Sequence, residues 1–410
     1  MGVDAIAAVS VFFPILFFLL AFVIGISAGT TVLIGQAWGA QNLEKVRCVI
    51  GSTLFMTLIG GSVIAVLGWS FAEHILQLLG TDPKVMHLSL PYVRWMLVGS
   101  PLLFVYIIYT SILRGVGDSV TPLIALSLTS LIGLAVTPVL LKGYFGFPAL
   151  GIVAPAIATI LGYAAVLIFL GFYLNYKNHP LKIDARLLQS IRHDATLSKL
   201  ILKLGIPTGI QMVTTSLAGL VIIGLVNHYG AHATAAYGAV NQVLNYIQFP
   251  ALSISIAASI FAAQAIGAGK PDLLAKVTRT ALGMNFLFTG SLIALAYLFS
   301  KYLMALFITD HSVIELGQQL LFIVLWAVLF FGASAIFASI MRASGTVNVP
   351  MMINILTIIL IEVPCAYWFS SLWGLTGIWT AYALSFVCLC ILQASYYQFV
   401  WKKTKIKVLI

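Results

Sequence analysis

Apolar residues run in long blocks along almost the whole chain, and short polar segments separate one block from the next. An α-helix needs about 20 apolar residues to cross a hydrocarbon core of roughly 30 Å, and the blocks have this length. We predict eleven membrane-spanning helices, at residues 5–33, 49–69, 90–113, 120–141, 149–174, 204–226, 233–263, 281–299, 316–341, 349–369 and 377–400. The pattern therefore predicts an all-α, polytopic membrane protein.

The composition changes this picture only by excluding other classes. Hydrophobic residues make up 61% of the chain and charged residues only 8%, a balance far from that of a soluble globular domain. The formal net charge is +10, which by itself would fit a nucleic-acid partner. Because the basic residues are spread over short breaks and not gathered on one module, we expect no nucleic-acid partner. The partner that the apolar blocks imply is the lipid bilayer.

The basic residues lie mainly on one side of the predicted helices. If the break after the first helix is cytoplasmic, only four of the 21 Lys and Arg residues face outward: Lys84, Arg94, Lys142 and Lys301. Basic residues accumulate on the cytoplasmic side of membrane proteins. We therefore predict a multi-pass cell-membrane protein, in the inner membrane if the source is a Gram-negative bacterium, with residues 175–203 and the C-terminus in the cytoplasm.

The sequence repeats itself at an offset of 228 residues. The aligned pairs are Gln36 with Gln264, Gly39 with Gly267, Thr81-Asp82 with Thr309-Asp310, and Arg114 with Arg342. The arginines suit the cytoplasmic ends of helices and the Thr-Asp pairs suit N-caps, so we interpret these landmarks as structural. A shared register across landmarks this far apart indicates two homologous halves.

The repeat predicts a domain organisation and one further helix. We expect an incomplete helical lobe at residues 1–174, a cytoplasmic linker at 175–203, a second lobe at 204–401 and a basic tail at 402–410. Gly2 aligns with Gly230, which a full helix precedes in the second half, whereas none precedes it in the first. We therefore expect a missing amino-terminal helix, through a start codon assigned too late or a truncation. Two complete six-helix lobes would be parallel repeats with a cleft between them.

Four short segments carry a resemblance to a known family. They are residues 35–40 (GQAWGA), 263–269, 113–118 (LRGVGD) and 204–207 (LGIP). Together with the half-length repeat and the basic linker, they resemble the multidrug and toxic compound extrusion (MATE) family over the whole chain. The resemblance implies a twelve-helix exporter whose lobes rock between outward and inward openings and exchange H⁺ or Na⁺ for small organic, often cationic, substrates.

The chain departs from the family pattern where ion coupling usually resides. The aspartate that many members carry in their first helix would precede residue 1. The acids that one branch carries in its seventh and tenth helices fall here at Thr215 and Phe331, and neither residue is acidic. The coupling mechanism of that branch therefore does not transfer to this chain.

Glu362 is the one acidic residue that falls clearly inside a predicted span. An ionisable group in hydrocarbon is costly unless it faces a cavity or a partner, so it is a candidate functional residue. Matching Pro364 with Pro138, which shortens the offset to 226 residues in this segment, places Glu362 opposite about Val136, so the shared architecture does not demand a charge here. We predict that Glu362 binds a proton or a cation; the alternative is a glutamate that helps two helices pack beside Pro364.

A second group of candidates is polar but neutral. Asn241, Asn245 and Gln248 are spaced i, i+4 and i+7 and share one face of a predicted helix, and Gln211 lies on the helix before it. These side chains either line a wet cleft and bind substrate or hold helices together by hydrogen bonds, and the sequence leaves both alternatives open.

The resulting hypothesis is a secondary active exporter of small organic compounds, cationic or amphipathic, that works as a monomer by H⁺ or Na⁺ antiport. A flippase for lipid-linked oligosaccharides is the main alternative, but it would need a strongly cationic central cavity, whereas the cations here lie in loops. An intramembrane enzyme would need clustered nucleophiles, metal ligands or acids. We therefore expect no enzymatic activity, no organic cofactor and no bound metal, and the four cysteines lack metal-ligand spacing.

Overall fold

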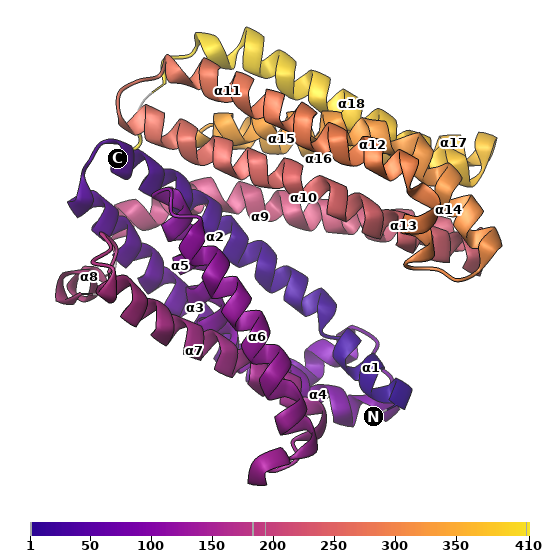
Figure 1. Ribbon diagram of the computed structural model, residues 1–410, viewed down its shortest axis with the longest axis horizontal. Helices are drawn as coiled ribbons and strands as arrows, with labels where there is room; N and C mark the ends of the chain where they lie inside the picture. The colour runs from indigo at the N-terminus through magenta and orange to yellow at the C-terminus, as the bar shows by residue number, and fades with distance from the viewer. Residues whose placement is uncertain (1, 183, 193, 407) are drawn as a thin grey trace. The chain divides into compact units, whose positions relative to one another are not determined.

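The computed structural model describes residues 2–182, 184–192, 194–406 and 408–410, and these residues form helices and loops without a strand (Figure 1). Lys407 of the predicted basic tail and the side chain of Arg186 in the predicted linker lie outside the described part. The chain divides into two compact units, one of Met1–Trp38 and Asn42–Gly209 and one of Gly39–Gln41 and Ile210–Ile410.

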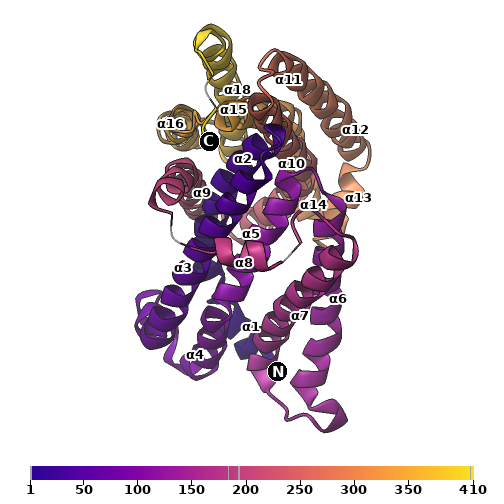
Figure 2. The same ribbon diagram turned by 90° about the vertical axis from the view of Figure 1, so that its left-hand side faces the viewer.

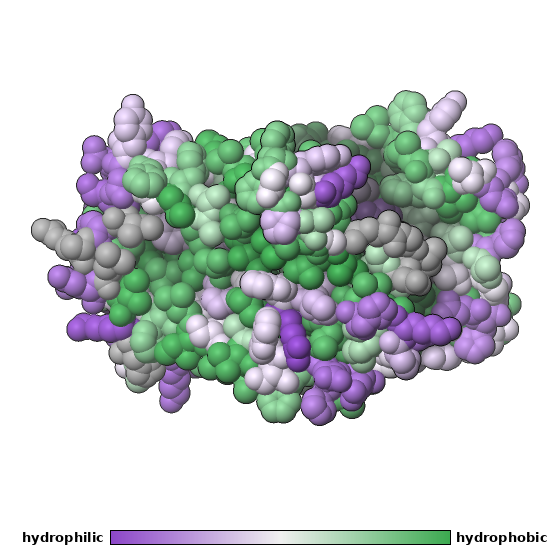
Figure 3. Space-filling view, turned by 90° about the horizontal axis from the view of Figure 1, so that it is seen from below, coloured by the Kyte–Doolittle hydropathy of each residue, from purple (hydrophilic) through white to green (hydrophobic). Residues whose placement is uncertain are grey.

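The described helices confirm the predicted all-α membrane class. Ten of them are long and apolar enough to cross a bilayer, a bent pair makes an eleventh candidate, and all eleven fall on the predicted blocks. The helices extend beyond the apolar blocks: α10 (Ala231–Gly267) has 37 residues, about 55 Å at ~1.5 Å per residue. Hydrophobic side chains cover much of the face shown in Figure 3, and many hydrophilic residues gather near its two ends.

The first unit is built from helices that pack in pairs. Its elements are α1 (Gly2–Ser10), α2 (Phe13–Gly39), α3 (Leu43–Leu78), α4 (Pro83–Val98), α5 (Ser100–Gly115), α6 (Val120–Lys142), the short η1 (Tyr144–Gly146) and η2 (Gly151–Val153), α7 (Ala154–Tyr176), α8 (Ala185–Ser190) and the first part of α9 (Ala195–Asn227). α3 packs against α4 and α5, α1 packs against α4, and α6 packs against α7. Figure 2 shows α6 and α7 side by side.

The predicted single helix at 90–113 is wrong in one respect, because it is broken. α4 and α5 meet at Gly99 and are bent by 46°. Pro101 stands in the first turn of α5, where a missing N–H costs little, but it cannot continue the hydrogen-bond ladder of α4. The hydroxyl of Ser100 donates to the carbonyl of Gly61 at 3.1 Å and ties the break to α3.

The second unit contains the longest helix and two π-helical turns. Its elements are the rest of α9, α10, α11 (Leu273–Met284), η3 (Asn285–Thr289), α12 (Gly290–Leu298), α13 (Ser300–Ala305), α14 (His311–Val324), η4 (Leu325–Ala327), α15 (Val328–Ala343), α16 (Asn348–Thr357), η5 (Ile358–Glu362), α17 (Val363–Trp373), α18 (Leu375–Phe399) and η6 (Trp401–Lys403). α15 packs against α10 and α18, and α17 packs against α18. The fully buried Trp379 of α18 lies in the hydrophobic core of this unit.

Helix ends repeat between the units at the offset that the sequence predicts. α2 and α10 end at Gly39 and Gly267, α4 and α14 begin at Pro83 and His311, and α5 and α15 end at Gly115 and Ala343. The predicted N-caps are confirmed, since Asp82 accepts from the backbone N–H of Lys84 at 2.8 Å and Asp310 accepts from that of Ser312 at 2.9 Å. The landmarks therefore mark where helices start and stop.

Candidate functional site

Glu362 ends η5, a π-helical turn between α16 and α17 of the second unit. Pro364 follows two residues later, and a proline has no N–H to offer the carbonyl four residues earlier. π-Helical turns inside α-helices are rare and are frequent at functional sites. The aligned Pro138 leaves α6 a continuous α-helix, so the wider turn is a property of the second unit and does not follow from the proline alone.

The carboxyl group of Glu362 is buried and has one hydrogen-bond donor from another helix. The side chain is 8% exposed, and its Oε2 accepts a hydrogen bond of 2.9 Å from the hydroxyl of Ser385 on α18. Glu73 and Glu315 also lie in long helices, but both are exposed. A buried carboxyl in a membrane span is costly and often marks a functional site, so Glu362 remains a candidate.

The aligned helix pair of the first unit packs without a carboxyl group. Val136 of α6 belongs to an apolar cluster with Leu140, Ala154 and Ala158. Aligning Gly151-Ile152 with Gly377-Ile378 places Thr159 opposite Ser385. The hydroxyl of Thr159 donates to the carbonyl of Pro155 in its own helix at 2.8 Å. Packing of this helix pair therefore does not require the Glu362–Ser385 bond.

An aromatic cluster of the second unit adjoins this site on α18. The hydroxyls of Tyr237 on α10 and Tyr382 on α18 are hydrogen-bonded at 3.2 Å. The ring of Trp379 lies 5.4 Å from that of Tyr237 and 5.5 Å from that of Tyr382 between ring centroids. The Nε1–H of Trp379 is buried and has no acceptor among the described residues, which is costly for a donor away from water. Phe331, at the position of a family acid, lies with its ring centroid 5.2 Å from that of Phe386 on α18, and the two rings are tilted against each other.

The predicted polar stripe lies on α10. Asn245 is exposed, Asn241 and Gln248 are half-buried, and no side-chain hydrogen bond is formed by any of the three within the described chain. Gln211 of α9 is half-buried as well. Amides with free donors and acceptors on one face can bind a polar ligand, so the structure leaves this role open to them.

The remaining sequence candidates lie at helix ends. Gln36 is fully buried and Gln264 half-buried, each one turn before the glycine that ends its helix. Arg114 occupies the last turn of α5 and Arg342 the last turn of α15. These positions fit the structural interpretation of the landmarks.

Asn285 is a polar residue of the second unit that the sequence interpretation missed. It begins the π-helical turn η3 and is fully buried. Its Nδ2 donates to the carbonyl of Leu329 at 3.1 Å, and its Oδ1 accepts from the hydroxyl of Thr289 at 3.1 Å. A methyl group at Gly332 would overlap this amide. The signal was a lone Asn near the start of the predicted span 281–299, which is less conspicuous than an acidic residue in a span.

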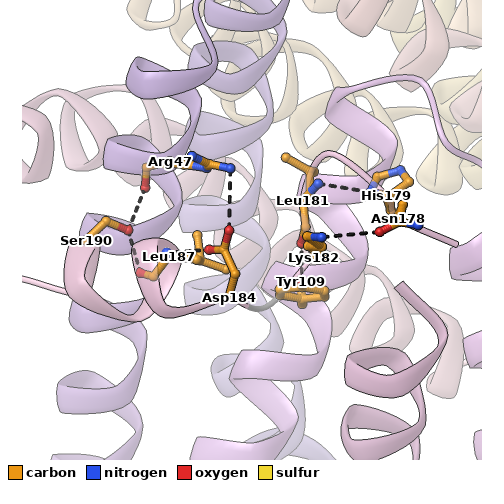
Figure 4. A network of polar contacts seen from close by, with 9 residues as sticks. All are labelled: Arg47, Tyr109, Asn178, His179, Leu181, Lys182, Asp184, Leu187 and Ser190. Carbon is orange, nitrogen blue, oxygen red and sulfur yellow. Dashed lines mark hydrogen bonds and ion pairs between the residues drawn. The ribbon is translucent and has the colours of Figure 1, made fainter. Parts of the chain in front are cut away.

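The predicted linker is attached to the first unit by side-chain contacts (Figure 4). Arg47 of α3 forms an ion pair of 3.6 Å with Asp184, and the hydroxyl of Tyr109 on α5 donates to the carbonyl of Leu181 at 2.8 Å. The hydroxyl of Ser190 donates to the carbonyl of Arg47 at 3.1 Å, and a methyl group at Gly51 would overlap the backbone of Ser190. The linker is therefore held at several points.

His179 adds a titratable contact to this attachment. Its Nδ1 accepts from the backbone N–H of Leu181 at 3.2 Å, and its Nε2 lies 3.7 Å from a carboxylate oxygen of Asp118. Burial lowers the pKa of His179, Lys177 adds to this effect and Asp118 opposes it. The neutral imidazole, which can accept from Leu181, is therefore the form that this site favours.

Two units of apolar helices with matching ends define the class of polytopic α-helical membrane proteins built from two repeated halves. The sequence profile of MatE matches residues 1–139 and 207–368. The chain therefore belongs to the MatE family, which confirms the resemblance found in the sequence.

Similar proteins cover the whole chain. The probable multidrug resistance protein YoeA of Bacillus subtilis is 45% identical over 412 residues, which cover 100% of this chain and 89% of that protein. The FAD transporter of Shewanella oneidensis is 28% identical over 378 residues, which cover 92% of this chain and 83% of that protein. An outward-facing multidrug resistance MATE family transporter of the MOP superfamily has a TM-score of 0.90 at 20% identity, over 98% of this chain and 90% of that one, which supports the fold.

Proposed function

We propose that this chain is a secondary active exporter of small organic compounds, cationic or amphipathic, that exchanges them for H⁺ or Na⁺ by alternating access of two lobes. It works in the cell membrane as a monomer, with the linker and the C-terminus in the cytoplasm and without an organic cofactor. The similarity to proteins named as multidrug resistance proteins supports efflux.

The observation that carries ion coupling is the buried Glu362 carboxyl with its Ser385 donor. A carboxyl inside a membrane span is energetically costly, and such groups occur mainly where they exchange a proton or bind a cation during transport. The apolar cluster at the aligned site of the first unit supports this role, because the helix pair packs there without an acid.

The test is efflux of ethidium, a fluorescent organic cation, from proteoliposomes with an imposed H⁺ or Na⁺ gradient. We expect wild-type efflux to follow one of the two gradients and Glu362→Gln to lose it while the protein inserts and folds. Glu315→Gln is the matched control, since that carboxyl is exposed at the start of α14. Wild-type efflux by the Glu362→Gln variant would contradict the role of this residue. FAD belongs in the same assay because one relative is an FAD transporter.

A further inference from the structure

A hydrogen bond between two tyrosines joins the Glu362 site to α10. Tyr382 stands one turn before Ser385 on α18, so both side chains lie on the same side of that helix. Ser385 bonds to Glu362, and Tyr382 bonds to Tyr237 across the helix interface at 3.2 Å. The carboxyl and α10 therefore share α18 as a common neighbour.

Tyr237 begins the polar face of α10. It precedes Asn241 by four residues, and Asn245 and Gln248 follow at eight and eleven, so all four residues share one side of the helix. Tyr237 is 6% exposed, whereas Asn241, Asn245 and Gln248 are half-buried or exposed. The polar stripe thus runs from accessible amides at one end to the buried tyrosine pair at the other.

Among the described elements, those packed most closely against η5 are α16, α17 and α18. These three helices carry no Asp, Glu, Lys, Arg or His. Their other titratable side chains are Cys365, Tyr367, Tyr382, Cys388, Cys390, Tyr396 and Tyr397. Glu362 is therefore the one acidic side chain near these helices, and Tyr382, one turn from its donor Ser385, is the hydroxyl that contacts α10.

We propose that Tyr382 and Tyr237 form a positioning pair that transmits the charge state of Glu362 to the polar face of α10, and that this face binds substrate. This inference rests on the proposed function. Either hydroxyl can donate in the Tyr237–Tyr382 bond. An ionised Glu362 attracts the hydroxyl hydrogen of Tyr382, so Tyr237 becomes the donor; a protonated Glu362 leaves Tyr382 free to donate, so Tyr237 becomes the acceptor.

The reversal changes what α10 offers to a ligand. With Tyr237 as acceptor, its own hydroxyl hydrogen is free for a neighbour on the polar face; with Tyr237 as donor, that hydrogen is occupied. The aligned positions of the first unit cannot do this, since Val136 replaces Glu362 and Ala156 replaces Tyr382. Coupling between two sites is a difference in binding free energy between two states, and a hydrogen bond with two donor directions supplies two such states.

The test measures ethidium binding to the purified protein in nanodiscs at pH 6 and pH 8. We expect the wild-type Kd to change by about fivefold or more between the two pH values, as couplings of this kind do. Tyr237→Phe should reduce this change to less than about twofold and keep a Kd near the wild-type value at pH 8, because no Tyr237 hydrogen is available at either pH. Tyr382→Phe should reduce the change equally but hold the Kd near the wild-type value at pH 6, because the Tyr237 hydrogen is then free at both pH values. A residue with only a packing role would shift both Kd values together.

The matched control is Tyr397→Phe, which removes a hydroxyl bonded to Thr278 at 2.8 Å further along α18. This variant should keep the wild-type pH dependence. Glu362→Gln should lose it, and if it does not, the proposed function fails together with this inference. If Glu362→Gln loses the pH dependence while both tyrosine variants keep it, the tyrosine pair is irrelevant and the proposed function stands. Wild-type binding that does not depend on pH would also overturn the inference. If the Tyr382→Phe variant does not fold, the Tyr237→Phe variant alone decides.

Discussion

Replacing Tyr109 by Phe should loosen the linker without disturbing the helices of the first unit. The Tyr109 hydroxyl donates to the carbonyl of Leu181 at 2.8 Å, and both residues are buried, at 3% and 2% exposure. A neutral hydrogen bond contributes about 1 kcal/mol, and leaving a buried carbonyl unpaired costs about 1–3 kcal/mol. The population of the detached linker should therefore rise by about fivefold to a hundredfold, because about 1.4 kcal/mol corresponds to a factor of ten.

The assay is amide hydrogen exchange of the peptide that contains residues 178–182. Its rate reports local opening when exchange follows the equilibrium population of the open form. Tyr106→Phe is the control, because Tyr106 lies on the same helix, is 7% exposed and makes a ring contact with Tyr163 but no hydroxyl bond among the described residues. Equal exchange rates in Tyr109→Phe and wild type would refute the conclusion that this bond holds the linker.

Three further predictions follow from local contacts. Asp82→Ala should weaken the start of α4 by about 1 kcal/mol, seen as faster amide exchange in its first turn, whereas Asp82→Ser should keep the cap. Because folding lowers the pKa of His179, the linker should be fully attached at pH values above 6.5, the ordinary pKa of histidine, and should detach as the pH falls below it. Amide exchange rates of the linker, corrected for the intrinsic effect of pH, measure this detachment. His179→Gln should remove the pH dependence. Gly332→Ala should cost about 1–3 kcal/mol in thermal unfolding by overlapping Asn285, whereas Gly133→Ala, with open space around it, should not destabilise.

The sequence was sufficient for the class, for the places where the spans fall and for two helix caps. Apolar blocks of bilayer length report burial in lipid, which depends on composition alone, so each block corresponds to a helix or a bent pair. Caps depend on a few local residues, so Asp82 and Asp310 could be identified without a structure. The 46° bend at Gly99 was missed, because apolar composition continues across it and only Pro101 signals the break.

The surroundings of the site could not be derived from the sequence. Glu362 was conspicuous as an acid in an apolar block, but its donor Ser385 lies 23 residues away and resembles the other serines of the spans. The Tyr237–Tyr382 bond joins residues 145 positions apart. Side-chain contacts of this kind depend on how helices rotate against one another, and hydrophobic periodicity is weak in helices that are apolar on all sides.

The two units separate what the fold requires from what one unit adds. Residues that serve the architecture recur at the same offset, as the ends of α5 and α15 show. Glu362 and Tyr382 do not recur, since Val136 and Ala156 occupy their positions, and Val136 lies in an apolar cluster of its own helix pair. An acid at the centre of a spanning helix costs about 2.5–3.5 kcal/mol on insertion scales. Because the aligned pair packs without this acid, the asymmetry between the units supports the role that we propose for Glu362.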